Sequence, residues 1–186
     1  MGLTIITDVA AEPLTLTEAK EHLRVSGSDD DSYITALITA ARHRAELYTQ
    51  RYIEAQTWDY TLDKFPSREF ELPINPITSI TSVKYFDSDQ VEQTLSSANY
   101  ELDSTSTVAR LRPISSESWP STYDQYNAVT IRIVGGYATT PLAISQAILM
   151  IIGTLYNDRE DTIVGASVAD VGLPSQRLLA PYRINP

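Results

Sequence analysis

The chain has 186 residues, 42% of them hydrophobic and 20% charged, which is enough for an ordinary core and for one domain. Its 14 Lys and Arg and 24 Asp and Glu give a formal net charge of -10, which argues against tight DNA binding because such binding relies on basic side chains at phosphates. The absence of cysteine excludes disulfides, thiol nucleophiles and thiolate metal sites, and suits a protein made in a reducing cytoplasm.

Neither a signal peptide nor a membrane span is predicted. Residues 1–11 lack a positively charged start and a sustained apolar run. The most apolar stretch, residues 142–155, is interrupted by Ser145 and Gln146. It is also shorter than the roughly twenty residues that cross a bilayer, so we interpret it as a buried helix.

Two helices are predicted near the start of the chain. Thr15 and Glu18 have the spacing of a capping box, in which each side chain reaches the backbone of the other. This first helix should end at Ser26–Ser28. A longer amphipathic helix is predicted over residues 29–52, where apolar residues recur every three or four positions. Its start, Asp29–Asp31, favours the positive end of the helix dipole, and this explains the three acids better than a cation site.

The next part of the chain, residues 57–136, is predicted to be antiparallel β structure. Apolar and polar residues alternate from Thr57 to Asp63, as in a strand with one buried face. Asp87–Gln90 is typical of a hairpin turn, and Gly135-Gly136 of a turn that ends a strand rather than of a phosphate loop. Further strands are expected at 77–86, 90–95, 100–102, 108–111 and 128–134.

Helix returns at Thr140-Pro141, where Pro suits the first helical position, and should run to about Asn157. Its apolar residues cover most of the circumference, so we expect burial on several sides, to which a neighbouring subunit would contribute. Residues 164–172 are expected to be mobile in an isolated subunit, and the whole segment 164–186 to be irregular until it docks.

No catalytic, cofactor-binding or metal site is predicted. Ser, His and Asp occur without a nucleophile-elbow sequence, and nothing singles out one carboxylate pair among 24 acids. His22 and His43 lack partners at metal-ligand spacing and are interpreted as helix-surface residues. The 11 Tyr residues lack interleaved basic residues, so packing is favoured over stacking on nucleic acid. Trp58 and Trp119 are expected to pack the β region, and the alternative for Trp119, which lies beside Pro120, is a place in an exposed loop.

Several short segments occur in a recognisable order along nearly the whole chain. They are Leu14–Lys20, Asp29–Arg42, Trp58, Leu72–Ile77 followed by Ser82–Tyr85, Gly135–Tyr137, Pro141–Ile144 and Leu178–Arg183. This series resembles the head–tail connector (adaptor) family of long-tailed double-stranded DNA bacteriophages and related gene transfer agents. It is most similar to the longer members, which carry a β insertion between the helices.

The resemblance implies a non-enzymatic virion protein of the neck, made in the host bacterial cytoplasm. About twelve copies would form a ring beneath the portal, lengthen the DNA channel, and join the head to a downstream neck, stopper or tail protein. The C-terminal segment would dock on the portal protein. The implied anchors are Leu178, Leu179, Tyr182 and Arg183.

Physical arguments agree with a ring of this kind. An acidic channel lets a DNA duplex slide without specific binding. A closed ring of head-to-tail contacts needs two different, complementary surfaces on each subunit. We expect the long amphipathic helix and the apolar helix to provide them. The residues expected at the subunit interface are Ile34, Leu37, Ile148, Ile152 and Leu155.

The predicted fold is α+β. A small helical body (1–56 and 137–163) would carry an antiparallel β-sandwich-like insertion (57–136) and a mobile C-terminal docking tail (164–186). Truncation after Val164 is then expected to leave the fold intact and to abolish attachment to capsids. Two alternatives stay open: another neck or tail-completion protein, and a small phage-encoded binding module or hydrolase built on the β region. The last would be a monomer with an aromatic cleft and paired carboxylates.

Overall fold

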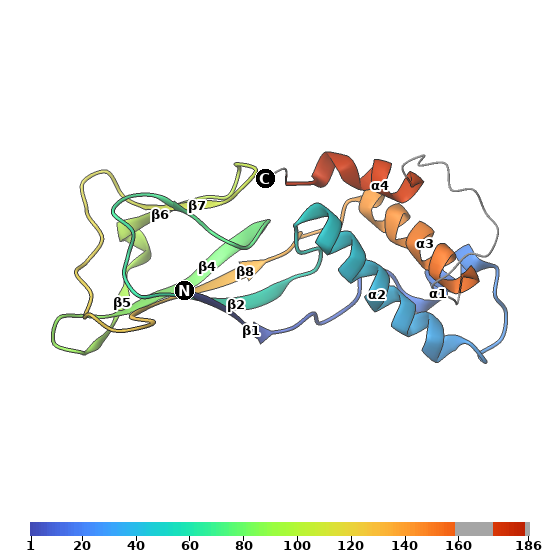
Figure 1. Cartoon of the computed structure of the whole chain (residues 1–186), viewed down its shortest axis with the longest axis horizontal. Helices are drawn as coiled ribbons and strands as arrows, with labels where there is room; N and C mark the ends of the chain where they lie inside the picture. The colour runs from blue at the N-terminus through green and yellow to red at the C-terminus, as the bar shows by residue number, and fades with distance from the viewer. Residues whose placement is uncertain (159–172, 185–186) are drawn as a thin grey trace. The chain divides into compact units, whose positions relative to one another are not determined.

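The computed structural model describes residues 1–158 and 173–184 (Figure 1). Within these residues the chain has four α-helices and eight strands, and every strand pair is antiparallel, so the α+β prediction is confirmed. The chain separates into two compact units rather than one body. A β unit comprises Met1–Ala10 and Glu54–Ala138, and a helical unit comprises Ala11–Ile53 and Thr139–Pro186.

The β unit contains two sheets. The first has five strands in the order β1-β2-β8-β4-β5, and the second has three in the order β3-β7-β6. A 3-10 turn, Ser97–Asn99, leads into β6. The strands are β1 (Gly2–Thr7), β2 (Gln56–Leu62), β3 (Phe70–Glu71), β4 (Ile77–Phe86), β5 (Glu92–Leu95), β6 (Tyr100–Asp103), β7 (Arg110–Pro113) and β8 (Val129–Gly135).

The core of the five-stranded sheet follows from alternation in its two central strands. Every second residue of β2 and of β8 is buried, as the apolar–polar pattern predicts. The two strands pair so that Trp58 lies opposite Ile133 and Tyr60 opposite Ile131, all four buried. Trp119 stacks on Phe65 with ring centroids 4.8 Å apart, so both Trp residues pack the β unit as expected.

Strand β1 was not predicted from the sequence. Gly2–Thr7 lies at one edge of the five-stranded sheet and pairs with β2, and all six residues are exposed. The pairing register shifts between Ile5 and Thr7. At this shift two apolar residues, Ile5 and Ile6, follow each other in the sequence. The strand therefore lacks the strict alternation by which a half-buried strand is recognised.

The helical unit contains α1 (Leu16–Leu23), α2 (Asp31–Thr49), α3 (Leu142–Asn157), α4 (Pro174–Leu179) and a 3-10 turn (Ala180–Tyr182). The predicted capping box is present: the Glu18 backbone N–H donates to Thr15 Oγ1 at 3.2 Å, and the Thr15 N–H donates to Glu18 Oε2 at 2.7 Å. The Tyr156 hydroxyl donates to Asp30 at 2.5 Å, which ties the end of α3 to the start of α2.

Helix α3 is buried by its own chain. It contacts α1, α2 and α4. Four of the five residues expected at a subunit interface, Ile34, Leu37, Ile148 and Ile152, are buried in this core, and Leu155 is partly buried. Because these four side chains are enclosed in their own unit, they expose little surface to a neighbouring subunit, and their place at an interface stays a prediction.

The end of the chain is more ordered than predicted. Residues 174–182 form α4 and the 3-10 turn, and α4 packs along α3 (Figure 1). Leu179 is 1% exposed. Its burial gives this segment a fixed place, so the expectation of irregular structure is wrong for residues 173–184. The stretch expected to be mobile, 164–172, lies outside the described residues.

Across the described ranges, 1–158 and 173–184, no helix is both long and apolar enough to span a membrane.

Candidate assembly surfaces

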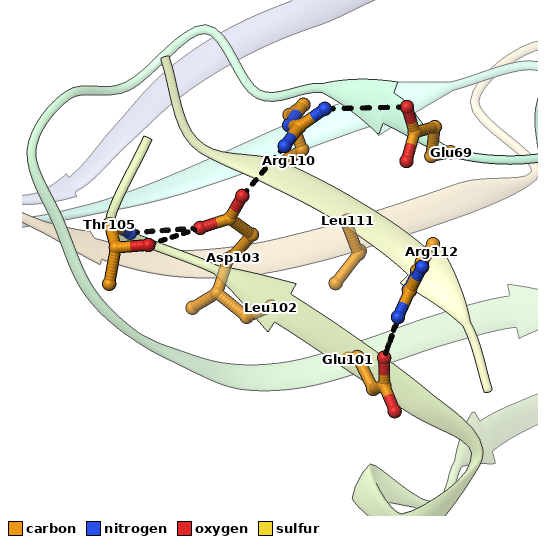
Figure 2. Close-up of a pocket in the computed structure, with 8 residues that line it drawn as sticks. All are labelled: Glu69, Glu101, Leu102, Asp103, Thr105, Arg110, Leu111 and Arg112. Carbon is orange, nitrogen blue, oxygen red and sulfur yellow. Dashed lines mark hydrogen bonds and ion pairs between the residues drawn. The ribbon is translucent and has the colours of Figure 1, made fainter. Parts of the chain in front are cut away.

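The β unit has a polar hollow of about 380 Å³ over the three-stranded sheet (Figure 2). Cross-strand register builds it. Glu101 and Asp103 of β6 lie directly opposite Arg112 and Arg110 of β7. Between them Leu102 faces Leu111, which is fully buried. The alternation therefore puts charges on one face of the sheet and leucines on the other.

Each arginine of this hollow is engaged by carboxylates. Arg110 Nη2 lies 2.9 Å from Asp103 Oδ2, and its Nη1 lies 3.5 Å from Glu69. Arg112 donates to Glu101 through Nε at 2.9 Å and Nη2 at 2.7 Å. The arrangement places opposite charges in pairs across neighbouring strands, and such pairs at a surface contribute little individually to stability.

Asp103 also organises the turn between β6 and β7. It accepts hydrogen bonds from the hydroxyls of Ser106 and Thr105, at 2.7 and 2.8 Å, and from Arg110. The Ser106 bond, followed by those from Arg110 and Thr105, holds the pKa of Asp103 well below its usual range. An acid held ionised in this way is a poor proton donor or base near neutrality, so the hollow is better suited to fixing a loop than to acid–base chemistry.

The helical unit has a second charged cluster, which is centred on the buried Arg42. Arg42 donates to Glu12 at 2.7 Å and to Glu46 at 3.0 Å, and the Ile53 backbone N–H donates to Glu46. Burial raises the pKa of Glu46. Burial also acts to raise the pKa of Glu12, but hydrogen bonds from Arg42 and Thr39 outweigh it, so that pKa is lowered. The cluster joins three segments of the unit and so has a structural role.

No group of three or more His, Asp or Glu residues in the described part of the chain could hold a metal ion. His22 and His43 are both exposed on helices, where the sequence places them.

The four residues predicted to dock on the portal lie on the helical unit itself. Leu179 is buried, Leu178 and Tyr182 are partly buried, and Arg183 is exposed. Backbone contacts fix the segment: Arg51 Nε donates to the Tyr182 carbonyl at 2.7 Å, and the Ile184 N–H to the Thr49 carbonyl at 2.9 Å.

Two exposed surfaces carry no charge, and sequence reasoning did not identify either. One is the edge strand β1. The other, here called the α3 stripe, is the exposed row of α3 and consists of Leu142, Gln146, Met150 and Thr154. A groove of about 290 Å³ adjoins it. The groove is lined by Arg44, Met150, Ile151, Thr154, Leu173, Pro174 and Ser175.

Comparisons with known proteins agree with a structural role. Residues 13–114, more than half of the chain, match the family model described as phage gp6-like head-tail connector protein. No curated protein matches the chain.

Solved structures share the fold. A protein from the neck of an empty GTA (gene transfer agent) particle, computed with C6 symmetry, superposes with a TM-score of 0.83 at 21% identity. Similar chains come from the virion of a native GTA particle (0.80, 21%) and from the neck of a native GTA particle computed with C12 symmetry (0.74, 21%). Each comparison covers 100% of this chain and 97% of the other.

The family match over more than half of the chain defines its class as a structural protein of the phage particle. The chain belongs to the phage gp6-like head-tail connector family. It is a structural connector between head and tail.

Proposed function

We propose that this connector forms a ring of about twelve copies in the neck of the virion, beneath the portal, where it lengthens the DNA channel. The observation that carries the proposal is the family match over residues 13–114, combined with likeness over the whole chain to proteins of GTA necks. The C12 symmetry with which one of those necks was computed supports the copy number. Ring formation by head-to-tail contact then needs two different surfaces on each subunit.

The charge of the chain suits a channel. With a formal net charge of -10, the subunit repels phosphate and releases few counterions on contact with DNA. A duplex would therefore pass through the ring without being held. Downstream, the ring would present a surface to the next neck, stopper or tail protein.

We also propose that the C-terminal segment binds the portal. Leu178, Tyr182 and Arg183 keep exposed surface for such a contact, whereas Leu179 is enclosed by its own unit. Use of Leu179 as an anchor therefore requires the segment to leave α3. Arg183 lies over the Tyr48 ring, 5.3 Å from its centroid, so release would also break this contact.

The test mixes purified protein with portal-bearing, DNA-filled capsids that lack tails, and images the vertex by cryo-electron microscopy. A ring beneath the portal, with the C-terminal segment against it, is the expected result. Density at the tail side alone would favour another neck or tail-completion protein. No density would overturn the connector ring.

A matched pair of variants tests the docking residues. Arg183→Glu should weaken attachment to capsids, whereas Arg24→Glu, which makes the same charge change at another exposed arginine of the helical unit, should not. Equal attachment of the two variants would contradict a docking role for Arg183.

A further inference from the structure

Charge limits the surfaces through which copies of this chain can touch. If the proposed ring exists, subunits that each carry a formal net charge of -10 lie side by side. Like charges brought together at an interface cost several kcal/mol, according to the general behaviour of protein complexes. Neighbouring copies should therefore meet where their surfaces are apolar and free of charge.

Strand β1 is one such surface. Its sequence, Gly-Leu-Thr-Ile-Ile-Thr, contains no charged residue and no proline, and its six residues are exposed. Ile5 and Ile6 are each close to half exposed, at 47% and 46%. Edge strands are usually protected by charges, proline or a covering segment, because an apolar edge attracts other chains. An unprotected apolar edge in an acidic protein points to a partner.

The α3 stripe is the second uncharged surface. Helix α3 has no charged residue from Leu142 to Asn157, and its exposed row recurs every four positions. Within it, Leu142 is 74% exposed and Met150 is 39% exposed. Leu173 extends the apolar area beside Met150, and the lining of the adjoining groove includes one charged residue, Arg44. Exposed Met with few charges nearby is typical of the core of a protein interface.

Besides Met1, which directly precedes β1, three other large apolar side chains are exposed outside these surfaces and the C-terminal segment in the described part of the chain: Leu47, Val91 and Tyr126. Each has acidic residues beside it in the sequence. Leu47 follows Glu46, Val91 lies between Asp89 and Glu92, and Tyr126 is two residues from Asp124. In a contact between copies, Asp89, Glu92 and Asp124 would bring like charges close to Val91 and Tyr126, whereas Glu46 beside Leu47 is largely buried against Arg42.

We infer that, in the ring, β1 of one copy packs against the α3 stripe of the next. A ring of identical subunits closes only if two different surfaces complement each other, and the described residues include two that carry exposed apolar side chains and no charge. The inference rests on the proposed ring and names the contact that builds it. It replaces the buried residues Ile34, Leu37, Ile148 and Ile152 with exposed ones.

The test places a charge on each surface and counts copies bound per portal-bearing, tailless capsid. Ile6→Lys and Met150→Lys should each lower occupancy by about tenfold or more, because a lysine would be desolvated without a partner. Leu47→Lys adds the same charge to a residue that is 73% exposed and should keep wild-type occupancy. Circular dichroism and thermal melting of the unassembled variants check that each still folds.

Substituting both positions in one chain tests whether residue 6 of one copy contacts residue 150 of the next. In a chain that carries Ile6→Lys and Met150→Glu, the lysine of one copy would face the glutamate of the next. Occupancy should then recover most of the tenfold loss seen with Ile6→Lys alone, by the logic of a double-mutant cycle. A doubly substituted chain that assembles no better than Ile6→Lys alone would overturn the pairing.

Cross-linking gives an independent readout, since the chain has no cysteine of its own. Oxidation of Ile6→Cys/Met150→Cys on capsids should yield a ladder of covalent multimers, because disulfides need Cα atoms within about 7 Å. Ile6→Cys/Leu47→Cys is the control pair and should stay monomeric. If wild-type rings form but both lysine variants fill them normally, the inference is wrong while the proposed function stands. If wild-type protein forms no ring, both are wrong.

Discussion

Gly136 shows how one backbone position can depend on the absence of a side chain. It follows β8 with a φ of 115°, and a Cβ atom there would overlap the backbone carbonyl of Glu54. The sequence predicted a turn at Gly135-Gly136 that ends the strand, and this is confirmed. The close approach of residue 54 depends on tertiary structure and could not be read from the glycines themselves.

Gly136→Ala is expected to destabilise the β unit by at least the roughly 1–3 kcal/mol that a strained backbone position costs, with the overlap added. Gly27→Ala is the matched control, since Gly27 also has a positive φ, of 94°, but has open space around it. Urea unfolding followed by circular dichroism measures both. Equal losses would show that backbone strain alone accounts for the effect and that the Glu54 contact adds nothing.

Asp103 links one side chain to the pH dependence of stability. Its pKa in the folded chain is lowered from the ordinary value of 3.8, chiefly by the Ser106 hydrogen bond. On acidification the unfolded chain therefore takes up this proton first. The stabilising effect is fully present above about pH 4 and is lost as the pH falls through the lower, folded value.

Asp103→Asn should therefore unfold more easily than the wild type at pH 7 and lose less further stability below pH 4. Ser106→Ala, which removes the largest single cause of the shift, should change the curve in the same direction but by less. Thermal melting across pH 2 to 7 measures all three proteins. A wild-type slope below pH 4 in Asp103→Asn would exclude Asp103 as its source.

At the scale of elements, local signals predicted most of the fold. The capping box of α1, the apolar periodicity of α2 and the alternation in β2 each describe a structure that neighbouring residues determine by themselves. The sequence-based predictions that failed concerned features that depend on tertiary contacts. Irregular structure was expected over residues 164–186, yet α4 begins at Pro174, which suits the first turn of a helix, and Leu179 is enclosed.

For the assembly surfaces too, local sequence predicted which residues are apolar but not which of them are exposed. Helical periodicity marked Ile148 and Ile152 as apolar and in need of cover, but could not say whether the cover came from the same chain. It also hid the α3 stripe, because Leu142 and Met150 are as apolar as the buried residues around them. Only their exposure in the folded unit distinguishes them.

The burial of Leu179 changes the expected result of truncation. A chain ending at Val164 loses α4, which packs on α3, so a hydrophobic part of the helical unit becomes exposed. The truncated chain should melt at a lower temperature than the full chain, contrary to the expectation from sequence that its fold stays intact. Leu179→Ala should lower stability by about 2–5 kcal/mol, the usual cost for a buried leucine. Leu178→Ala, at a partly buried neighbour, should cost less. A truncated chain as stable as the full one would show that α4 contributes nothing to the unit.

For the whole molecule, the acidic charge and the uncharged surfaces predict how assembly responds to salt. Repulsion between copies with a net charge of -10 is screened over about 30 Å at 0.01 M salt and about 10 Å at 0.1 M. Apolar contacts between β1 and the α3 stripe are not weakened by the same change. Occupancy of portal-bearing, tailless capsids should therefore rise with NaCl between 0.01 and 0.15 M and then level off.

Sedimentation with quantified bound protein measures this occupancy. Leu47→Lys reduces the net negative charge of each copy outside the contact, so this variant should need less salt to reach the plateau. If occupancy falls steadily as salt increases in the Arg183→Glu variant as well as in the wild type, ion pairs hold the copies together, which would contradict a ring built on uncharged surfaces.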